Sequence, residues 1–383
     1  MNNKQFTEKY YIKRGKYNTV KWQAGKEKNC LPMWIADMDF KPDEKIVKAL
    51  NDWVSYGDYG YASLPDDYYD VLIKWNKEQH NLTINKDWVR FSKGAIDGLY
   101  QIIYSLTKQN DAILINTPIY HPFKQTIKRT KRTVIESKLI NTNSYFTFDY
   151  EDIEAKFKKH KVKAMILCSP HNPVGRVFKQ GELQQLLDIC KKYHVLVISD
   201  EVHNDLIMPD QTFIPTLSFK KYQKQVITLT AVSKTFSFPV FDHCHVIIPN
   251  ESLRKKFDEY QHDNHLSSVN IMNALPTYYG YMYGKQWLKQ VNDVVFENYN
   301  YFTKELSKYF DITPLEGSYL IFVNIGKYNK DKSAANYLIR QAHILTNAGE
   351  VFGKGYNNWV RINLATSLAN IKKAVKQLKT ITK

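Results

Sequence analysis

The sequence predicts an α/β fold in which a large unit built on a mostly parallel sheet is followed by a smaller α+β unit. Three observations lead to this prediction. Short apolar runs alternate with amphipathic segments through the middle of the chain, which is typical of buried parallel strands joined by crossover helices. After residue 280, apolar residues recur at steps of three and four, which indicates a long amphipathic helix. The chain has 383 residues, 43% of them hydrophobic, which suits two domains or one large α/β unit.

These patterns divide the chain into three parts. Residues 1–50 look irregular, and we expect them to pack on the C-terminal unit. Residues 51–275 form the large unit, with strands expected at residues 112–115, 164–168, 195–198, 226–229 and 246–248. Residues 276–383 form the small unit, with a helix over 287–306, a strand at 319–323, a helix near 333–342 and an apolar segment at 359–364.

The composition narrows the classes of function. The formal net charge is +16, but the lysines are scattered, so we expect a solvated surface and no nucleic-acid partner. The densest lysine run, residues 156–163, is expected to be an exposed turn. No apolar run approaches the roughly 18 residues of a membrane span, and the N-terminus lacks the apolar core of a secretory signal. Four cysteines without a Cys-x-x-Cys pair predict a cytoplasmic protein with no metal site.

Four chemically distinct side chains follow the expected strands. Tyr120 comes after the run at 112–115, Asn172 after 164–168, Asp200 after 195–198 and Lys234 after 226–229. Because ligands of open α/β sheets bind at the carboxyl ends of the strands, we expect these four side chains to meet at one edge. Any one of them alone is explained by a strand-end cap or a turn, whereas the combination points to a binding site.

The lysine indicates the chemistry of that site. A lysine beside a buried strand is costly unless it is neutral, paired or covalently engaged, so Lys234 is a candidate for Schiff-base formation. A carboxylate on the neighbouring strand, Asp200, suits the protonated ring nitrogen of pyridoxal 5′-phosphate (PLP). Asn172 can donate to the phenolic oxygen of the ring, and Tyr120 can stack on its face. A lone lysine would be interpreted as a surface residue, but the three polar groups together favour a PLP site.

The motifs resemble those of the MalY/PatB-type cystathionine β-lyases, or C–S lyases, within the class I/II aminotransferase superfamily. The subgroup markers are Met33-Trp34-Ile35-Ala36-Asp37-Met38-Asp39-Phe40 and Ser199-Asp200-Glu201-Val202-His203-Asn204-Asp205-Leu206. Segments shared with aminotransferases lie at residues 57–61, 118–123, 169–175, 233–236 and 360–363. The resemblance implies a fold-type I PLP enzyme with a mostly parallel seven-stranded sheet. It also implies a homodimer and a role in methionine biosynthesis.

The resemblance assigns the cofactor contacts. Lys234 is implied to hold PLP as a Schiff base and to move the Cα proton, and Asp200 to keep the pyridine ring protonated. His203 and Asn172 are implied to lie at the phenolic oxygen, and Tyr120 to stack on the ring and contact the substrate. The implied phosphate contacts are the backbone of Gly94, Ala95 and Ile96 at a helix N-terminus, the Ser233 hydroxyl and Tyr61 from the partner subunit.

The resemblance also implies the substrate and the reaction. Arg361 would bind the substrate carboxylate bidentately, helped by the backbone of Ile35 and Ala36. The implied reaction is β-elimination from cystathionine or a related cysteine S-conjugate, an amino-acid thioether, giving a thiol such as homocysteine, pyruvate and ammonia. Two alternatives stay open: an aminotransferase, which uses the same residues, and a regulatory or binding protein on this fold.

Three residues depart from the family pattern. Val240 stands where relatives have glycine, and Asp242 stands where aminotransferases often place a phosphate-binding arginine. His121 replaces a second tyrosine after Tyr120. A carboxylate facing a phosphate is repulsive, so either Asp242 points away or the phosphate site is weaker. The cluster at residues 243–245 (His-Cys-His) is interpreted as packing, because two imidazoles alone make a poor zinc site.

Overall fold

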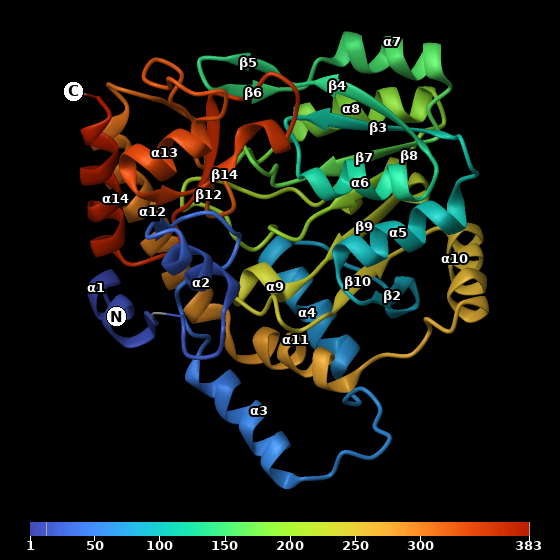
Figure 1. The fold of residues 1–383 in the computed structure, drawn as a ribbon. Helices are drawn as coiled ribbons and strands as arrows, with labels where there is room; N and C mark the ends of the chain where they lie inside the picture. The colour runs from blue at the N-terminus through green and yellow to red at the C-terminus, as the bar shows by residue number, and fades with distance from the viewer. Residues whose placement is uncertain (13, 383) are drawn as a thin grey trace.

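The computed structural model describes residues 1–12 and 14–382. Its two larger sheets lie side by side (Figure 1). The larger sheet and its helices fill the right of the view, and the red and orange C-terminal elements fill the left. The blue N-terminal helices lie beside the C-terminal elements, and both chain ends are on that side.

The large sheet has seven strands in the order β2-β10-β9-β8-β7-β3-β4. Their bounds are β2 (Val89–Ser92), β10 (Cys244–Ile247), β9 (Val226–Thr230), β8 (Leu196–Asp200), β7 (Ala164–Cys168), β3 (Ala112–Thr117) and β4 (Thr133–Lys138). The five strands from β9 to β4 are parallel, so the predicted α/β fold and mostly parallel sheet are confirmed. The expectation that the run at 246–248 is parallel is wrong, since β10 is antiparallel to both neighbours. The link from β9 to β10 holds only α9 (Val232–Thr235) and a loop, too little for a long crossover helix.

Helices cover both faces of this sheet. Alternate strand residues point to opposite faces, so Ile113 and Ile115 join one core while Leu114 joins the other. The first core lies under α5 (Ala95–Leu106), α6 (His121–Arg129) and α10 (Glu251–Asp263). The second lies under α4 (Tyr68–His80), α7 (Tyr150–His160) and α8 (Gln180–Lys192). Burial on both faces explains why these strands read as continuous apolar runs.

The C-terminal part contains the elements expected from its periodicity. An antiparallel sheet in the order β11-β12-β15-β14 comprises β11 (Asp311–Ile312), β12 (Leu320–Asn324), β15 (Trp359–Asn363) and β14 (Asn347–Ala348). The helices are α12 (Lys285–Leu306), α13 (Ala334–Ala342) and α14 (Leu368–Thr380). A small hairpin of β5 (Ile140–Thr142) and β6 (Tyr145–Thr147) lies outside both larger sheets.

The N-terminal part is more regular than expected. It forms α1 (Asn3–Tyr10) and α2 (Val20–Glu27). A capping box at Asn2 starts α1, and the buried side chains of Phe6 and Tyr10 pack it against the core. Next, β1 (Leu31–Pro32) pairs with β13 (Ile344–Leu345), which supports our proposal that residues 1–50 pack on the C-terminal unit. The proposed unit boundaries at 50 and 275 fall inside α3 (Glu44–Tyr56) and α11 (Ile271–Tyr283).

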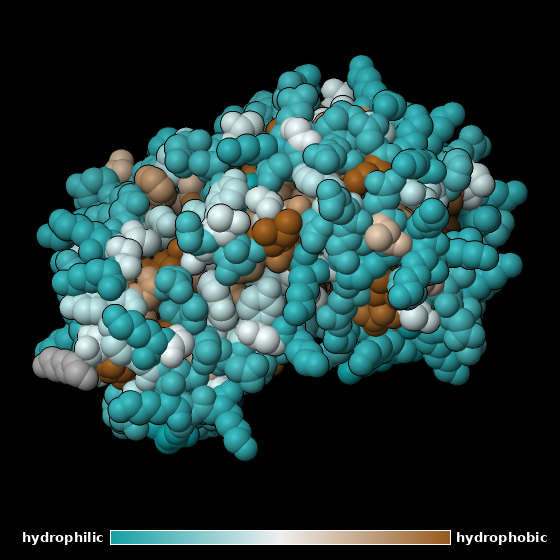
Figure 2. Space-filling model, turned by 90° about the horizontal axis from the view of Figure 1, so that it is seen from above, coloured by the Kyte–Doolittle hydropathy of each residue, from teal (hydrophilic) through white to brown (hydrophobic). Residues whose placement is uncertain are grey.

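The surface carries most of the positive charge. Figure 2 shows a mainly hydrophilic face with hydrophobic residues in small, separate patches. The expectation of an exposed turn at residues 156–163 is wrong, because residues up to His160 belong to the last turns of α7. Basic side chains are favourable there, at the negative end of the helix dipole. Among the described residues, every helix is too short or too polar to cross a bilayer.

Candidate active site

The carboxyl ends of four parallel strands bring the expected residues to one edge of the sheet. In the register, Cys168 of β7 lies opposite Asp200 of β8, which in turn lies opposite Leu229 of β9. Asn172 follows β7 and Lys234 follows β9 by a few residues, so both emerge beside Asp200. Tyr120 follows β3 at the same edge and is the N-cap residue of α6.

Lys234 is held without a counter-ion. It lies in the four-residue helix α9, and its Nζ donates to the carbonyl oxygen of Ala36 at 3.1 Å. Among the described residues no carboxylate forms an ion pair with it. Burial lowers the pKa of its amine, the charge of Arg361 acts in the same direction, and the charges of Asp37 and Asp200 oppose them. A lysine with a lowered pKa has a larger fraction of the nucleophilic neutral amine.

Asp200 is a buried carboxylate that lacks a strong partner. Within the described part of the chain, its side chain accepts a single hydrogen bond, from the backbone N–H of Val202 to Oδ1 at 3.1 Å. Burial raises the pKa of Asp200 to about 6, against the lowering effects of that N–H and of the Lys234 charge. A group that favours the buried anion, such as a protonated pyridine nitrogen, would remove this cost.

The raised pKa predicts a pH-dependent stability of the cofactor-free protein. Between pH 4 and 6 the native state keeps the Asp200 proton that the unfolded state has released, so stability should fall as the pH rises. The full effect is on the order of 3 kcal/mol in the free energy of unfolding. Denaturant unfolding at several pH values measures it.

Asp200→Asn is the matched variant for this prediction. Nearby Glu201 is also buried, with a pKa raised to about 7. The wild type and Asp200→Asn both keep the contribution of Glu201 to the pH dependence of stability. The difference between the wild type and Asp200→Asn should therefore isolate the Asp200 slope between pH 4 and 6. Identical slopes in the two proteins would contradict the assignment of the raised pKa to Asp200.

Arg361 reaches the same edge from the small sheet. On β15, its Nη1 donates to Asn172 Oδ1 at 3.0 Å, and its Nη2 donates to Asn347 Oδ1 at 2.7 Å and to the Trp34 carbonyl at 3.2 Å. Its Nε is buried and has no partner among the described residues. Burial lowers the pKa of Arg361 to about 10. A carboxylate ligand would supply the missing partner and offset the burial of the charge.

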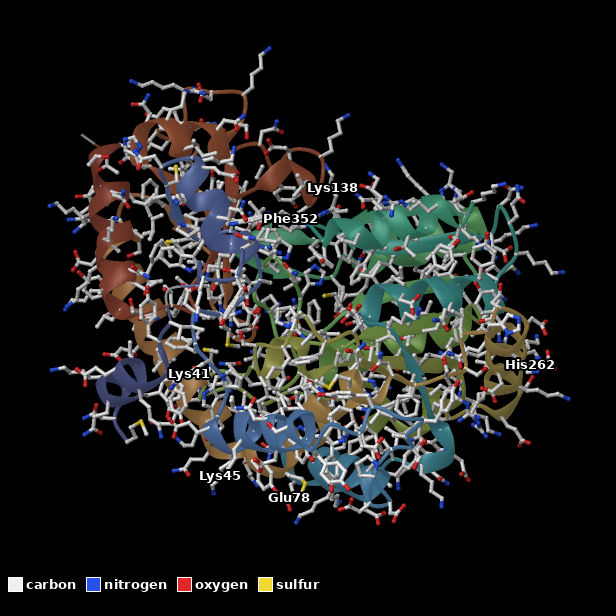
Figure 3. The ribbon with its side chains drawn as sticks, turned by 60° about the horizontal axis from the view of Figure 1, so that its bottom comes forward. Lys41, Lys45, Glu78, Lys138, His262 and Phe352 are labelled. Carbon is white, nitrogen blue, oxygen red and sulfur yellow. The ribbon has the colours of Figure 1, made fainter. Side chains whose placement is uncertain are left out.

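Aromatic rings complete the walls around this guanidinium. Phe352 lies 5.0 Å from the guanidinium carbon of Arg361, measured to the ring centre. Figure 3 labels it where the C-terminal elements meet the large sheet. The His121 ring lies 6.3 Å from that of Phe352, with its Nδ1 buried and unpartnered among the described residues. Burial lowers the pKa of His121 and raises that of Tyr120, so both are neutral at pH 7.

His203 lies beside the lysine and the arginine as a neutral ring. Burial, followed by the charges of Lys234 and Arg361, lowers its pKa to about 3. Its Nδ1 is buried without a partner among the described residues, although it follows Asp200 by only three positions. A buried, unpaired ring nitrogen is costly in the free protein and is available to a polar ligand.

The N-terminus of α5 provides an open cradle. Gly94 is its N-cap, with φ +122°, a conformation that side chains rarely adopt. A Cβ built on Gly94 would meet nothing within 4 Å, so the space in front of the helix is open. Ala95 and Ile96 form the first turn, where free N–H groups favour an anion such as a phosphate. Ser233 is half-buried next to Lys234.

Several residues singled out in the sequence lie outside the site of this chain. Tyr61 is fully exposed, and its predicted role from the partner subunit stays a prediction. Asp242 is exposed to solvent, and Val240 also lies on the surface, so neither is buried in the site. The carbonyl of Ile35 accepts Asn363 Nδ2 at 2.7 Å and that of Ala36 accepts Lys234, so this backbone positions other residues.

The residues fit PLP. The carboxylate of Asp200, with its raised pKa, suits the pyridinium nitrogen. The amine of Lys234, which has no counter-ion among the described residues, lies beside it. The open N-terminus of α5 suits the phosphate. The unpartnered His203 Nδ1 adds a polar group for the ring substituents. These features come from β8 and the turn that follows it, from α9 and from the N-terminus of α5, and PLP carries groups that would contact each of them.

Comparison with known proteins decides the family. The model for aminotransferase class I and II matches residues 28–378. The chain belongs to this family. Its cofactor is pyridoxal 5′-phosphate, as in PLP-bound solved structures that resemble it. The family match and these structures confirm the predicted resemblance and the fold-type I architecture.

Three relatives illustrate the range of the family around this chain. A PLP-bound aminotransferase candidate from Clostridium difficile 630 is 33% identical, with 99% of both chains covered and a TM-score of 0.93. Cystalysin from Treponema denticola, which contains PLP, is 29% identical, with 98% of both chains covered and a TM-score of 0.93. The cystathionine beta-lyase PatB of Bacillus subtilis is 28% identical over 94% of this chain and 96% of its own.

Sequence reasoning missed several residues of the site. Asn347 and Phe352 come from short segments of the small unit and carry no motif signal. Arg14 lies in a stretch without periodicity, and its guanidinium Nη1 lies 3.2 Å from Asp37 Oδ1. Asp37 lies in the Trp-Ile-Ala-Asp-Met-Asp-Phe segment, which marks the subgroup, but the sequence assigns Asp37 no role in the site.

The expected packing role of residues 243–245 agrees with the local contacts. The Nε2 atoms of His243 and His245 lie 2.7 and 2.8 Å from the hydroxyl oxygen of buried Tyr68. Burial lowers the pKa of both imidazoles, so both are neutral. The Tyr68 hydroxyl can donate to one ring and accept from the other, which satisfies the pair inside the core.

Proposed function

We propose that this protein catalyses PLP-dependent β-elimination from cystathionine or related cysteine S-conjugates, releasing a thiol, pyruvate and ammonia. The observation that carries the proposal is the amine of Lys234, which has no counter-ion, a lowered pKa and the buried carboxylate of Asp200 nearby. The name of PatB, a cystathionine beta-lyase, favours cleavage of a carbon–sulfur bond over other reactions of the family. That the substrate is cystathionine or a related thioether is part of this proposal.

The chain's own residues account for the steps around the cofactor. Arg361 binds the substrate carboxylate through its fork of N–H groups and so fixes the Cα position. The Lys234 amine then takes the Cα proton, because burial lowers its pKa and so increases its neutral fraction. PLP, when bound, would supply an electron sink for the pair left by the broken Cα–H bond. Asp200 would stabilise the positive charge on the pyridine nitrogen that this chemistry requires.

The end of the reaction needs less from the protein. As the C–S bond breaks, the thiolate leaves with the bonding electrons and takes a proton from the site or from water. Tyr120 is neutral and is the N-cap residue of α6 at the carboxyl end of β3, which supports its proposed stacking on the ring face. The released enamine hydrolyses in water to pyruvate and ammonia, so one water is consumed per turnover and no second amino acid is needed.

The proposal is tested with purified holoenzyme and L-cystathionine. We expect pyruvate and a free thiol to form in equal amounts without any added 2-oxo acid. If product forms only when a 2-oxo acid is present, the enzyme is an aminotransferase. That is the second candidate function, and the Clostridium difficile relative supports it by its description. If neither reaction occurs and the protein binds PLP, the proposal is wrong.

We also propose a homodimer whose sites are completed across the interface. Helix α3 projects from the body (Figure 1), and the segment around its C-terminal end carries three exposed tyrosines, Tyr56, Tyr59 and Tyr61. A cavity of about 420 Å³ lies against Trp53, Tyr59 and Tyr61. Exposed aromatic residues of this kind are typical of protein interfaces, and Tyr61 has no role in its own chain.

Subunit mixing tests this arrangement. Tyr61→Ala and Lys234→Ala homodimers should each be nearly inactive. After dissociation and reassembly in equal amounts, heterodimers should contain one intact site, and activity should recover to about one quarter of the wild type. The same mixing with Tyr17→Ala, another exposed tyrosine, in place of Tyr61→Ala controls for activity lost during dissociation and reassembly, because that mixture should keep about half of the wild-type activity before and after the treatment. No recovery by the first pair would show that Tyr61 acts within its own subunit.

A further inference from the structure

Two aspartates of the Trp-Ile-Ala-Asp-Met-Asp-Phe segment differ sharply in their surroundings. Asp39 accepts from Trp22 Nε1 at 2.8 Å and pairs with Lys21 at 3.1 Å, and the Lys21 and Asp39 side chains are each 1% exposed. Asp37 is 13% exposed, and among the described residues its only ion pair is with Arg14. Asp39 therefore belongs to a closed structural pair, whereas Asp37 is accessible from outside the core.

The carboxylate of Asp37 has unused capacity for hydrogen bonds. Both of its oxygens share a single nitrogen, Arg14 Nη1, at 3.2 and 3.4 Å. The Ser237 hydroxyl adds one contact at the limit of 3.5 Å. A carboxylate offers about four acceptor positions. Burial raises the pKa of Asp37, which agrees with an anion that is poorly solvated by the protein.

Asp37 lies beside the reacting position. It follows Ala36, whose carbonyl accepts the Lys234 amine at 3.1 Å. Of the charges that act on Lys234, that of Asp37 has the largest effect, ahead of Arg361 and Asp200. In the proposed reaction the Lys234 amine lies at the substrate Cα, and the S-substituent begins one carbon further on. Asp37 is thus a carboxylate within reach of the S-substituent, while Asp200 is occupied with the ring nitrogen.

Arg14 supplies the opposite charge at the same place. Its Nη2 donates to the Ser237 hydroxyl at 2.7 Å, which ties it to the loop that follows Lys234. Its Nε is buried without a partner among the described residues. The hydroxyl of buried Tyr319 lies near enough for the charges of Asp37, Arg361 and Arg14 to act on its pKa, which burial raises. The pair offers an acceptor and a donor, which matches the ammonium and carboxylate of an amino-acid head group.

We propose that Asp37 and Arg14 form a subsite for the charged end of the S-substituent, with Asp37 binding a distal ammonium group and Arg14 a distal carboxylate. The substrates it favours are thioethers that end in an amino-acid head group or in an amine. This inference rests on the proposed function, because it assigns the substrate class of the same site. It makes Asp37 and Arg14 specificity-determining residues that contact the leaving group.

Four substrates that differ only in the end of the S-substituent test the subsite. L-cystathionine carries both charges, S-(2-aminoethyl)-L-cysteine only the ammonium, S-(2-carboxyethyl)-L-cysteine only the carboxylate, and S-propyl-L-cysteine neither. For the wild type, we expect kcat/KM of the aminoethyl compound to exceed that of the propyl compound about tenfold. Asp37→Asn should abolish this preference, so that the ratio of the aminoethyl to the propyl kcat/KM falls to about one, whatever common change follows from removing the charge that acts on Lys234. Arg14→Gln should lower kcat/KM only for the two substrates with a distal carboxylate.

The controls separate recognition from structure. Asp210→Asn makes the same change at an exposed carboxylate and should leave all four values unchanged. If Asp37→Asn lowers kcat/KM equally for all four substrates, Asp37 has only a structural role and the inference is overturned. If the wild type shows no preference for the aminoethyl over the propyl compound, the inference is overturned without any variant, even where Asp37→Asn fails to fold.

A binding experiment keeps the subsite testable if the proposed function fails. L-lysine and L-norleucine lack a leaving group on Cβ, have the same chain length, and differ in the distal ammonium. Calorimetric titration of the wild-type holoenzyme should give a Kd about tenfold lower for L-lysine, and Asp37→Asn should remove the difference. Absence of pyruvate from every thioether together with this preference would reject β-elimination and keep the subsite. Equal Kd values in the wild type would reject the subsite.

Discussion

Lys234→Ala is expected to abolish turnover, lowering kcat by at least about a thousandfold. The amine has no counter-ion, its pKa is lowered by burial, and it lies beside the one buried carboxylate suited to a pyridinium ring. No other lysine among the described residues combines these features at the strand edge. Removing it takes away both the covalent attachment of the cofactor and the group that moves the Cα proton.

Two measurements separate these roles of Lys234. Borohydride reduction of the wild-type holoenzyme followed by peptide mass analysis should place the PLP mass on the peptide that contains Lys234. The Lys234→Ala protein should lose this covalent mass and the visible absorption band, while it keeps the fold by circular dichroism. Lys220→Ala, at an exposed lysine, should retain both signals. Covalent PLP on a different lysine would contradict the assignment.

Much of the large sheet could be predicted from the sequence, because burial on both faces leaves a direct record in the strands. The runs at β3, β7, β8 and β9 are continuous and apolar, and they coincide with the strands. The strands β2 and β4 were not predicted individually. In β4, Thr133 and Lys138 are exposed, so its pattern is mixed. The antiparallel direction of β10 depends on the short link after α9, and no periodicity within β10 records it.

The candidate site was predictable only where parallel strands bring residues together. The proximity of Asn172 and Asp200 follows from adjacent parallel strands, which end at the same edge. The proximity of Arg361 to Asn172 does not, because 189 residues separate them and the contact joins two sheets. The resemblance to a known family supplied Arg361, whereas Asn347 carries no motif and was found only in the structure.

The two motif aspartates show a further limit of sequence reasoning. Asp37 and Asp39 are separated by one residue and are both flanked by apolar side chains. Asp37 pairs with Arg14 and Asp39 pairs with Lys21. Both basic residues lie in a part of the chain whose helices the sequence does not predict. The difference between a closed structural pair and an accessible carboxylate therefore depends on tertiary contacts.

Arg361→Gln is expected to lower kcat/KM for L-cystathionine by about a hundredfold or more, because a misplaced carboxylate also misplaces the Cα proton relative to Lys234. The kcat/KM of Arg361→Lys should lie between those of the wild type and Arg361→Gln. The lysine keeps the charge but lacks the planar guanidinium that reaches Asn172 and Asn347 together. Steady-state pyruvate release measures all three proteins, with Arg129→Gln, at an exposed arginine on α6, as the control.

The decarboxylated analogue of the substrate sharpens the test of Arg361. It should be a very poor substrate for the wild type, and Arg361→Gln should not reduce its turnover further. A loss of equal size with this analogue would assign Arg361 to holding the two units together, not to binding the carboxylate.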